Sequence, residues 1–387
     1  MLVFWVLAHF YRWSLCLWYF CAVHDPEFLI RHNLRPPDAV YLVPGCSCVF
    51  SRGEIFVKIL LPVAGKGTRL RPHTHTKAKS LVHVAGKTVL EHIVSRLVPL
   101  DAAEYLFITD ENGGQVKEFM EAAFPGLNCR YIVQKERQGP AHAVALAEAF
   151  IEPGDDLLIV FNDTIFDADL TLIHTLCADC DGLIYSKEVE DYQRFGVNVV
   201  RDGLIFDMVE KPDTLVSKLA QVGLYYLKDG VSFMRYLKET ISACETVKGE
   251  YYLPAVFMRM IRDGRSFRAP EIDAWLDCGT PETLLQTNSY LLAGRHHNHG
   301  DVVNSVLIEP VHIEEGAVVR GSILGPNVSV AARSVVEASI LSNTIINSDS
   351  LVTNMILHDS ILGDSVHLVG STRRMNIGDH SLIEMQG

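Results

Sequence analysis

Apolar residues between positions 57 and 295 alternate between the spacing of strands and the spacing of helices. Short apolar runs predict four strands, at 57–63, 105–109, 130–134 and 157–161. Apolar residues three or four positions apart predict four helices, at 87–97, 115–124, 141–150 and 170–176. Such alternation indicates βαβ units, and therefore an α/β fold with a mostly parallel sheet and helices on both faces.

A different pattern begins near residue 302. The triplet Ser-Val/Ile-Leu starts at residues 305, 322 and 339 and returns at 360. Aliphatic residues also recur six positions apart, in the sets Ile313 and Val319; Leu324, Val330 and Val336; Ile340, Ile346 and Val352; Ile356, Leu362 and Leu368. A six-residue step with a coil of about 17–18 residues predicts a three-sided parallel β-helix of four or five coils. A plain β-sandwich is the alternative.

These patterns divide the chain into three parts. Residues 57–295 form an α/β domain, which the helix expected at 280–292 closes, and residues 301–387 form the β-helix. The segment 295–300, with its three histidines, is interpreted as a solvated linker, with a metal site as the alternative.

The first 56 residues do not fit either pattern. Residues 1–23 are strongly apolar, but Arg12 interrupts them, and the charge order of a signal peptide is absent. Three interpretations stay open: translation upstream of a start at Val57, a membrane anchor, or an accessory segment.

Composition and charge narrow the classes of function. The 387 residues are 48% hydrophobic and 21% charged, which is typical of a globular protein of two or three domains. A formal net charge of −13 argues against a nucleic-acid partner, because such binding neutralises phosphates with Lys and Arg. Nine cysteines without a regular spacing argue against a secreted disulfide scaffold, so the expected location is the cytoplasm.

A glycine-rich segment follows the first predicted strand. It contains Ala64, Gly65, Gly67, Thr68 and Arg69. Glycines allow backbone N–H groups to approach a phosphate, and an arginine adds a rigid fork of donors. Ten residues further on, Lys79 is close enough in sequence to reach the same phosphates.

Polar residues also follow later strands. Gln134 can donate and accept hydrogen bonds at a pyrimidine edge, and Gly139 before the next helix leaves room for a base or a ribose. Asp163 lies at the carboxyl end of a strand, where a carboxylate can hold Mg²⁺ together with substrate phosphates.

The run LPVAGKGTRLRPHTHTKAKSLVHVAGK resembles the N-terminal signature of the sugar-1-phosphate nucleotidylyltransferases. The similarity extends from about Val57 to the C-terminus. It is greatest to the glucose-1-phosphate thymidylyl- and uridylyltransferases in their long form. The resemblance implies a Rossmann-like domain followed by a hexapeptide-repeat left-handed β-helix. It also implies the transfer of a nucleotidyl group from UTP or dTTP to a sugar 1-phosphate, with Mg²⁺ as cofactor and release of pyrophosphate.

The resemblance further implies roles for individual residues. Asp163 and Asp277 would bind Mg²⁺, Arg69 the leaving pyrophosphate and Lys79 the α-phosphate, while Gln134 would read the base. The residues expected to bind the sugar and its phosphate are Gly196, Glu210, Lys211, Tyr225 and Glu250.

Two other functions stay open. One is a non-catalytic, nucleotide-sugar-binding regulatory subunit. The other is a bifunctional enzyme whose β-helix transfers acyl groups, with His312, His358, His367 or His380 as the base. We expect a homo-oligomer for each of these functions. We expect no membrane contact unless residues 1–23 are an anchor.

Overall fold

The computed structural model describes residues 56–111, 113–244, 246, 249–294 and 297–370. By its contacts the chain divides into two units, residues 1–55 and 56–387, and only the second contains described residues. The three interpretations of the N-terminal segment therefore lie outside the described residues.

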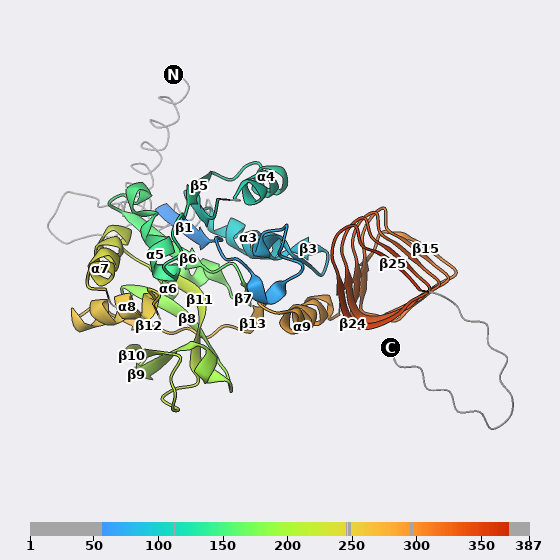
Figure 1. The fold of residues 1–387 in the computed structure, drawn as a ribbon. Helices are drawn as coiled ribbons and strands as arrows, with labels where there is room; N and C mark the ends of the chain where they lie inside the picture. Colours follow the sequence, from blue (N-terminus) through green and yellow to red (C-terminus); the bar gives the residue numbers. More distant parts are fainter. Residues whose placement is uncertain (1–55, 112, 245, 247–248, 295–296, 371–387) are drawn as a thin grey trace, which may run out of the picture. The chain divides into compact units, whose positions relative to one another are not determined.

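The centre of the α/β domain is a nine-stranded sheet (Figure 1). Its parallel part has the order β6-β1-β4-β5 and consists of β1 (Phe56–Pro62), β4 (Glu104–Thr109), β5 (Cys129–Val133) and β6 (Asp155–Val160). Every residue of β4 and β6 is buried, which is the pattern of a parallel sheet covered on both faces. These strands lie within two residues of the predicted ranges, and the α/β fold is confirmed.

Beyond β6 the sheet continues with antiparallel strands, which the sequence pattern did not reveal. They are β8 (Gly182–Glu188), β9 (Gly196–Arg201), β10 (Leu204–Glu210) and β11 (Leu219–Leu227), with β12 (Phe267–Arg268) parallel to β8 at the edge. The register between β11 and β8 shifts: Gln221 pairs with Ser186, but Tyr225 already pairs with Ile184. This bulge interrupts the hydrogen-bond ladder beside a cavity that Gln221 and Tyr225 line, called the main cavity below.

The helices cover the sheet. They are α3 (Val89–Leu97), α4 (Gly114–Ala123), α5 (Pro140–Ala145), α6 (Ile173–Leu176), α7 (Gly230–Ser242), α8 (Leu253–Arg262) and α9 (Pro281–Leu292). Side chains of α5, α7 and α8 pack with Leu60, Leu106 and Leu157 in one large core. The prediction for 141–150 was too long, because α5 ends at Ala145 and a 3-10 turn occupies Glu148–Phe150. The segment 170–176 likewise begins as a 3-10 turn before α6.

Two small sheets lie outside the central one. Strand β2 (His83–Val84) pairs with β3 (Lys87–Thr88), and β7 (Thr164–Asp167) pairs antiparallel with β13 (Ala274–Asp277). Among the described residues, no helix is both long enough and apolar enough to cross a bilayer.

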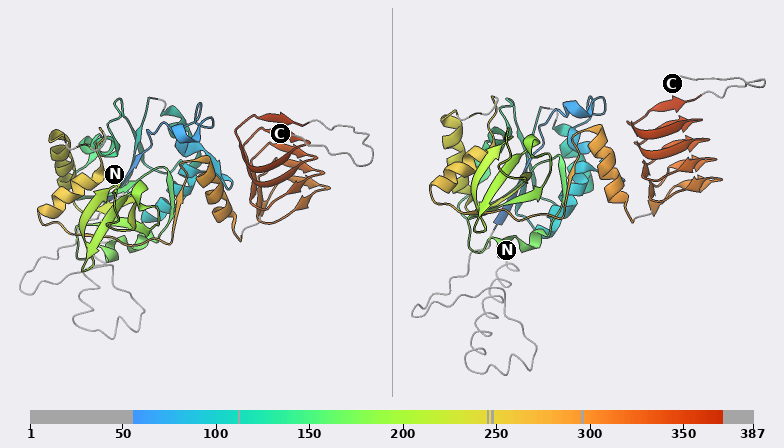
Figure 2. Two further views of the ribbon diagram at one scale, coloured as in Figure 1. Left: turned by 60° about the horizontal axis from the view of Figure 1, so that its bottom comes forward. Right: turned by 90° about the horizontal axis from the view of Figure 1, so that it is seen from below.

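The C-terminal part is a parallel β-helix, as predicted, and Figure 2 shows its coils stacked on one another. One face consists of β15 (Asp301–Val303), β18 (Val318–Arg320), β21 (Val335–Glu337), β23 (Leu351–Thr353) and β25 (His367–Val369). The other two faces contain β14 (His297–Asn298), β16 (Val306–Leu307), β17 (Val311–Ile313), β19 (Ile323–Leu324), β20 (Val328–Val330), β22 (Ile340–Ile346) and β24 (Ile356–Leu362).

The predicted register of the β-helix was wrong at one corner. Ile340 and Ile356 were expected inside, but they are 45% and 78% exposed, whereas Leu341 is buried. The step from Val336 to Leu341 is five residues, as is the equivalent step from Val319 to Leu324 in the coil before. The next step, from Leu341 to Ile346, is five residues instead of the six from Leu324 to Val330, so coils of 17 residues are followed by coils of 16. Consequently the triplet at 360–362 pairs with 344–346 and is not a copy of the triplet at 339–341.

The interpretation of 295–300 as a linker was also wrong in part. Strand β14 pairs with β17, so the β-helix already begins at His297. The rings of His297 and His299 lie near each other and His297 lies near His312. Within the described residues, no group of three or more His, Cys, Asp or Glu side chains is arranged to hold a metal ion.

Helix α9 connects the α/β domain to the β-helix through one buried side chain. Asn288 donates to the backbone oxygen of Asn327 at 3.1 Å, and its side-chain oxygen accepts from the Ser329 hydroxyl at 2.7 Å. The same oxygen accepts from the backbone N–H of Ala85 at 3.0 Å. A fully buried amide with these partners fixes the helix against both neighbours.

A pH dependence of stability follows from His312. Burial, and then the charges of His297 and His299, lower its pKa to about 4. The unfolded chain therefore binds more protons than the folded chain between about pH 6.5 and pH 4, and stability falls as the pH decreases through this window. We expect the loss to reach at most about 3 kcal/mol.

Urea unfolding at several pH values measures this effect. The variant His312→Asn should flatten the profile between pH 6.5 and pH 4, whereas His367→Asn, at an exposed histidine on β25, should leave it unchanged. Equal slopes for the wild type and His312→Asn would contradict the assignment.

Candidate active site

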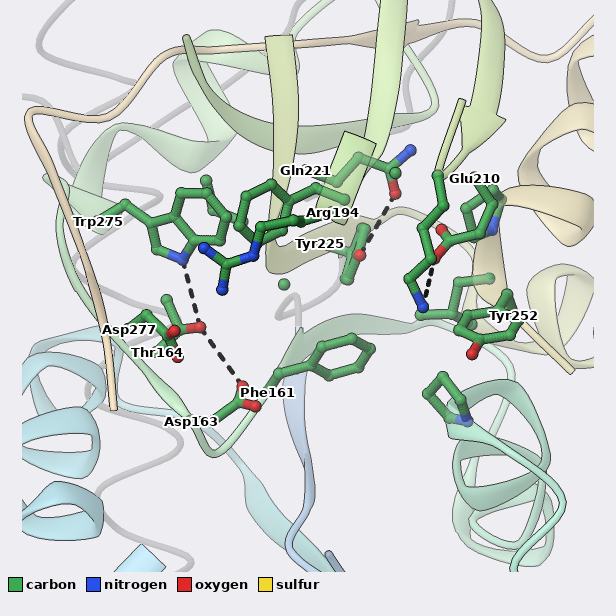
Figure 3. A pocket seen from close by; sticks show the side chains of 18 of the residues that line it. Phe161, Asp163, Thr164, Arg194, Glu210, Gln221, Tyr225, Tyr252, Trp275 and Asp277 are labelled. Carbon is green, nitrogen blue, oxygen red and sulfur yellow. Dashed lines mark hydrogen bonds and ion pairs between the residues drawn. The ribbon is translucent and has the colours of Figure 1, made fainter. Parts of the chain in front are cut away.

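A cavity of about 400 Å³ opens beside the carboxyl end of β6 (Figure 3). The structure brings together here seven of the residues singled out in the sequence: Arg69, Asp163, Gly196, Glu210, Lys211, Tyr225 and Asp277. They come from segments more than 200 residues apart, so the fold gathers them.

Two carboxylates lie at one end of the cavity. Asp163 follows β6, and Asp277 ends β13. The pairing of β13 with β7 continues in a hydrogen bond from the backbone N–H of Cys278 to the backbone oxygen of Asp163, at 2.9 Å. The backbone therefore holds the two aspartates close together.

Lys79 forms an ion pair with Asp163. Its Nζ lies 2.9 Å from Oδ2 of Asp163, and its side chain is only 9% exposed. The lysine reaches this position because the chain turns tightly at Gly67, whose φ is +59°. A Cβ at Gly67 would lie 3.0 Å from Thr74 and 3.1 Å from Lys79, so this position needs glycine.

The two carboxylates titrate in opposite directions. Burial acts to raise the pKa of Asp163, but the charge and the hydrogen bond of Lys79 outweigh it, so that pKa is lowered. The pKa of Asp277 is raised by burial and then by the negative charge of Asp163. Lys79 and Arg69 offset this effect only partly. Burial is thus the main reason why Asp277 holds its proton more tightly, and the charge of Asp163 adds to that effect.

The other end of the cavity holds Glu210 and Lys211. Burial raises the pKa of Glu210, although Lys211 opposes the shift. The two charged groups are 3.6 Å apart, and the ammonium of Lys211 lies over the ring of Tyr252, 5.1 Å from its centre. A Cβ at Gly196 would lie 2.7 Å from Oε2 of Glu210, so the carboxylate rests against the backbone there.

A second cavity of about 740 Å³ lies beside the glycine-rich segment. Gly65, Lys66, Arg71, Lys77 and Arg137 are among the residues that line it. Gly65 and Thr68 are exposed, while Ala64 is buried. Asp110, Glu111 and Glu118 line the same cavity, and two of the cations are paired, Arg137 with Asp110 at 2.9 Å and Lys77 with Asp364. Lys66, Arg71 and the exposed backbone at Gly65 are features of a phosphate-binding surface.

The remaining predicted residues do not line either cavity. Gln134 is buried, and its Nε2 lies 3.3 Å from Nδ1 of His142. A Cβ at Gly139 would lie 2.6 Å from the backbone oxygen of Tyr251, so segment 250–251 occupies part of the space expected for the base or ribose. Glu250 is exposed and accepts a hydrogen bond of 2.7 Å from Tyr252, which does line the main cavity.

Sequence reasoning missed several residues that line the main cavity. Trp275 donates to the Thr164 hydroxyl at 3.3 Å (Figure 3). Its ring meets that of Phe195 edge-on. Both aromatic residues stand beside predicted site residues, which is the signal that could have identified them. Gln221 likewise precedes the segment that ends at Tyr225, but its place at the cavity follows from the bulge in β11.

Comparisons with known proteins identify the relatives of this chain. Residues 58–294 match the family described as nucleotidyl transferase. The chain is 32% identical over 225 residues to the UTP–glucose-1-phosphate uridylyltransferase AglF of Haloferax volcanii, covering 57% of this chain and 90% of that protein. It is 30% identical over 284 residues to a glucose-1-phosphate thymidylyltransferase of Streptomyces antibioticus, covering 70% and 77%.

Other matches are partial or concern the fold. The chain is 29% identical over 265 residues to the bifunctional protein GlmU of Methanococcus maripaludis, covering 66% of this chain but only 60% of that protein. A crystal structure of UDP-glucose pyrophosphorylase with UDP-glucose superposes with a TM-score of 0.54 at 23% identity, over 62% of this chain and all of that one.

Proposed function

The chain belongs to the nucleotidyl transferase family, and on that premise we propose that it transfers a nucleotidyl group from UTP or dTTP to a sugar 1-phosphate, with glucose 1-phosphate as the first candidate. The products are an NDP-sugar and pyrophosphate. The observation that carries the proposal is one cavity with two carboxylates and Lys79 at one end and the Glu210–Lys211 pair at the other. The names of AglF and the Streptomyces relative support the same reaction.

The mechanism follows from the charges that must meet. A phosphate oxygen of the sugar phosphate attacks the α-phosphorus of the triphosphate, and pyrophosphate leaves. Repulsion between the two anions is the main obstacle, so catalysis rests on positioning and on neutralising charge. Lys211 holds the incoming phosphate, Lys79 faces the α-phosphate, and Arg69 holds the leaving group.

A divalent cation fits the carboxylate end. The donor set of Asp163 and Asp277 consists of oxygen atoms only, and a divalent cation would offset both the burial and the repulsion from Asp163 that raise the pKa of Asp277. Mg²⁺ prefers one or two carboxylates together with substrate phosphates. We therefore propose that these two residues hold Mg²⁺, which when bound neutralises the phosphates.

For the nucleotide, we propose that the second cavity and the glycine-rich segment accept the triphosphate. Gly65, Gly67 and Thr68 offer backbone N–H groups to the phosphates. Ala64 is buried and anchors the segment to the domain. Gln134 and Gly139 remain the proposed contacts to the base.

Pyrophosphate release from a panel of nucleoside triphosphates and sugar 1-phosphates tests the function. We expect release with UTP or dTTP together with a hexose 1-phosphate, and only when Mg²⁺ is present. No release from any pair would contradict the proposal and favour a non-catalytic sensor. Turnover of acetyl-CoA would instead support an acyltransferase in the β-helix, whose candidate His380 lies outside the described residues.

The Lys79–Asp163 pair gives a second prediction. Lys79→Ala and Asp163→Asn should each reduce kcat by at least about tenfold, which corresponds to about 1.4 kcal/mol of barrier. A matched control is Lys58→Ala, which breaks another buried pair, 2.8 Å from Asp155 and outside the cavity. That variant should lower the stability but keep kcat. A normal kcat in Lys79→Ala or Asp163→Asn would remove the catalytic assignment.

We also propose a homo-oligomer, formed through one face of the β-helix. Val306, Ile323, Ile340 and Ile356 stand in register on successive coils, and all are 37–78% exposed. A second copy carries a ladder of the same pitch, so the two ladders can interlock.

Light scattering after size exclusion tests this interface. Ile340→Glu should reduce the mass to that of a monomer, because it would bury a charge between the copies. The control Val303→Glu changes an exposed aliphatic residue on another face and should keep the oligomer. A monomeric wild type would contradict the proposal.

A further inference from the structure

We propose that Gln221 is a specificity-determining residue that accepts a hydrogen bond from one hydroxyl group of the sugar. This inference rests on the proposed function and deepens it. Gln221 lines the main cavity beside Tyr225 (Figure 3), although only 8% of the residue is exposed. Its amide is not free to turn, because a chain of buried hydrogen bonds fixes it.

The donor and acceptor roles in this series of hydrogen bonds follow from its last acceptor. The backbone oxygen of Ile184 can only accept, so the Ser186 hydroxyl donates to it, at 2.9 Å. The single hydroxyl proton is then used, and Ser186 accepts from Nδ2 of Asn198 at 2.9 Å. The side-chain oxygen of Asn198 therefore faces Gln221 and accepts from its Nε2 at 3.0 Å.

The consequence is a fixed acceptor beside the cavity. With Nε2 committed to Asn198, Gln221 directs Oε1 to the other side, where the Tyr225 hydroxyl lies 3.4 Å away. Ser186 and Asn198 are fully buried, so reversing the amide would leave donors and acceptors unpaired away from water. A reversed Gln221 is therefore strongly disfavoured.

The neighbours of Gln221 favour a sugar hydroxyl over a phosphate. A Cβ at Gly196 would lie 2.7 Å from Oε2 of Glu210 and 3.4 Å from both Cδ and Nε2 of Gln221, so the carboxylate and the amide border the same strip of backbone. The carboxylate of Glu210 would repel a phosphate there and attract O–H donors. Burial raises the pKa of Tyr225, so its hydroxyl stays protonated and donates to Oε1 of Gln221, whose second lone pair can accept from the sugar.

The bulge in β11 explains why these groups meet. Gln221 pairs with Ser186 and Tyr225 with Ile184, so four steps on β11 correspond to two on β8. The Ser186 hydroxyl bonds to the Ile184 carbonyl within this irregular region. The bulge thus brings the buried, hydrogen-bonded side chains of Ser186 and Asn198 next to the wall of the cavity.

The test compares sugars rather than rates alone. The kcat/KM of the wild type and of Gln221→Leu is measured with glucose 1-phosphate and its 2-, 3-, 4- and 6-deoxy analogues. We expect Gln221→Leu to lose at least about tenfold with glucose 1-phosphate and with all analogues except one. The analogue lacking the recognised hydroxyl should react equally well with both enzymes, which also shows that the variant is folded.

Three outcomes would overturn the assignment. An equal loss with every sugar would show a structural role, and no loss with any sugar would show that Gln221 makes no contact. Gln221→Met, which keeps the length of the side chain, distinguishes misfolding from lost recognition, because it should repeat the pattern of Gln221→Leu. The exposed control Gln286→Leu on α9 should behave as wild type. A wild type inactive with every sugar would contradict the proposed function and this assignment together.

Discussion

The site depends on one electrostatic constraint: the backbone holds two carboxylates together, and burial together with the charge of Asp163 opposes the ionisation of Asp277. The hydrogen bond between the backbones of Cys278 and Asp163 joins their segments. Lys79 compensates Asp163, whose pKa is lowered, but the pKa of Asp277 stays raised. A cation bound at this end would offset both effects, which supports the proposed metal site.

The two halves of the central sheet contribute different parts of the cavity. The parallel half supplies Asp163 at the end of β6 and carries the glycine-rich turn after β1. The antiparallel half supplies Glu210 and, through the bulge in β11, Gln221 and Tyr225. Under the proposed function, charge neutralisation thus rests on regular strands, and recognition of the sugar rests on the part of the sheet where the ladder is irregular. A change in the bulge could alter substrate choice without moving the carboxylates.

The sequence was sufficient for features that depend on local pattern and insufficient for those that depend on distant contacts. Apolar runs revealed the parallel strands, and charged residues after strands pointed to Asp163 and Lys211. The exposure of Ile340 was missed because a strict six-residue step was applied across a five-residue corner, although Ile340 repeats the exposed Ile323 and Leu341 the buried Leu324. The role of Gln221 was equally hidden, since its partners Asn198 and Ser186 are 23 and 35 residues away in sequence.

Binding of Mn²⁺, followed by electron paramagnetic resonance in the presence of UTP or dTTP, tests the central constraint most directly. If Asp163 and Asp277 share one cation, the wild type binds one Mn²⁺ per site. Asp163→Asn and Asp277→Asn then each weaken that binding by about tenfold or more. Unchanged binding in either variant would show that the two carboxylates do not hold a common ion, and would contradict the account.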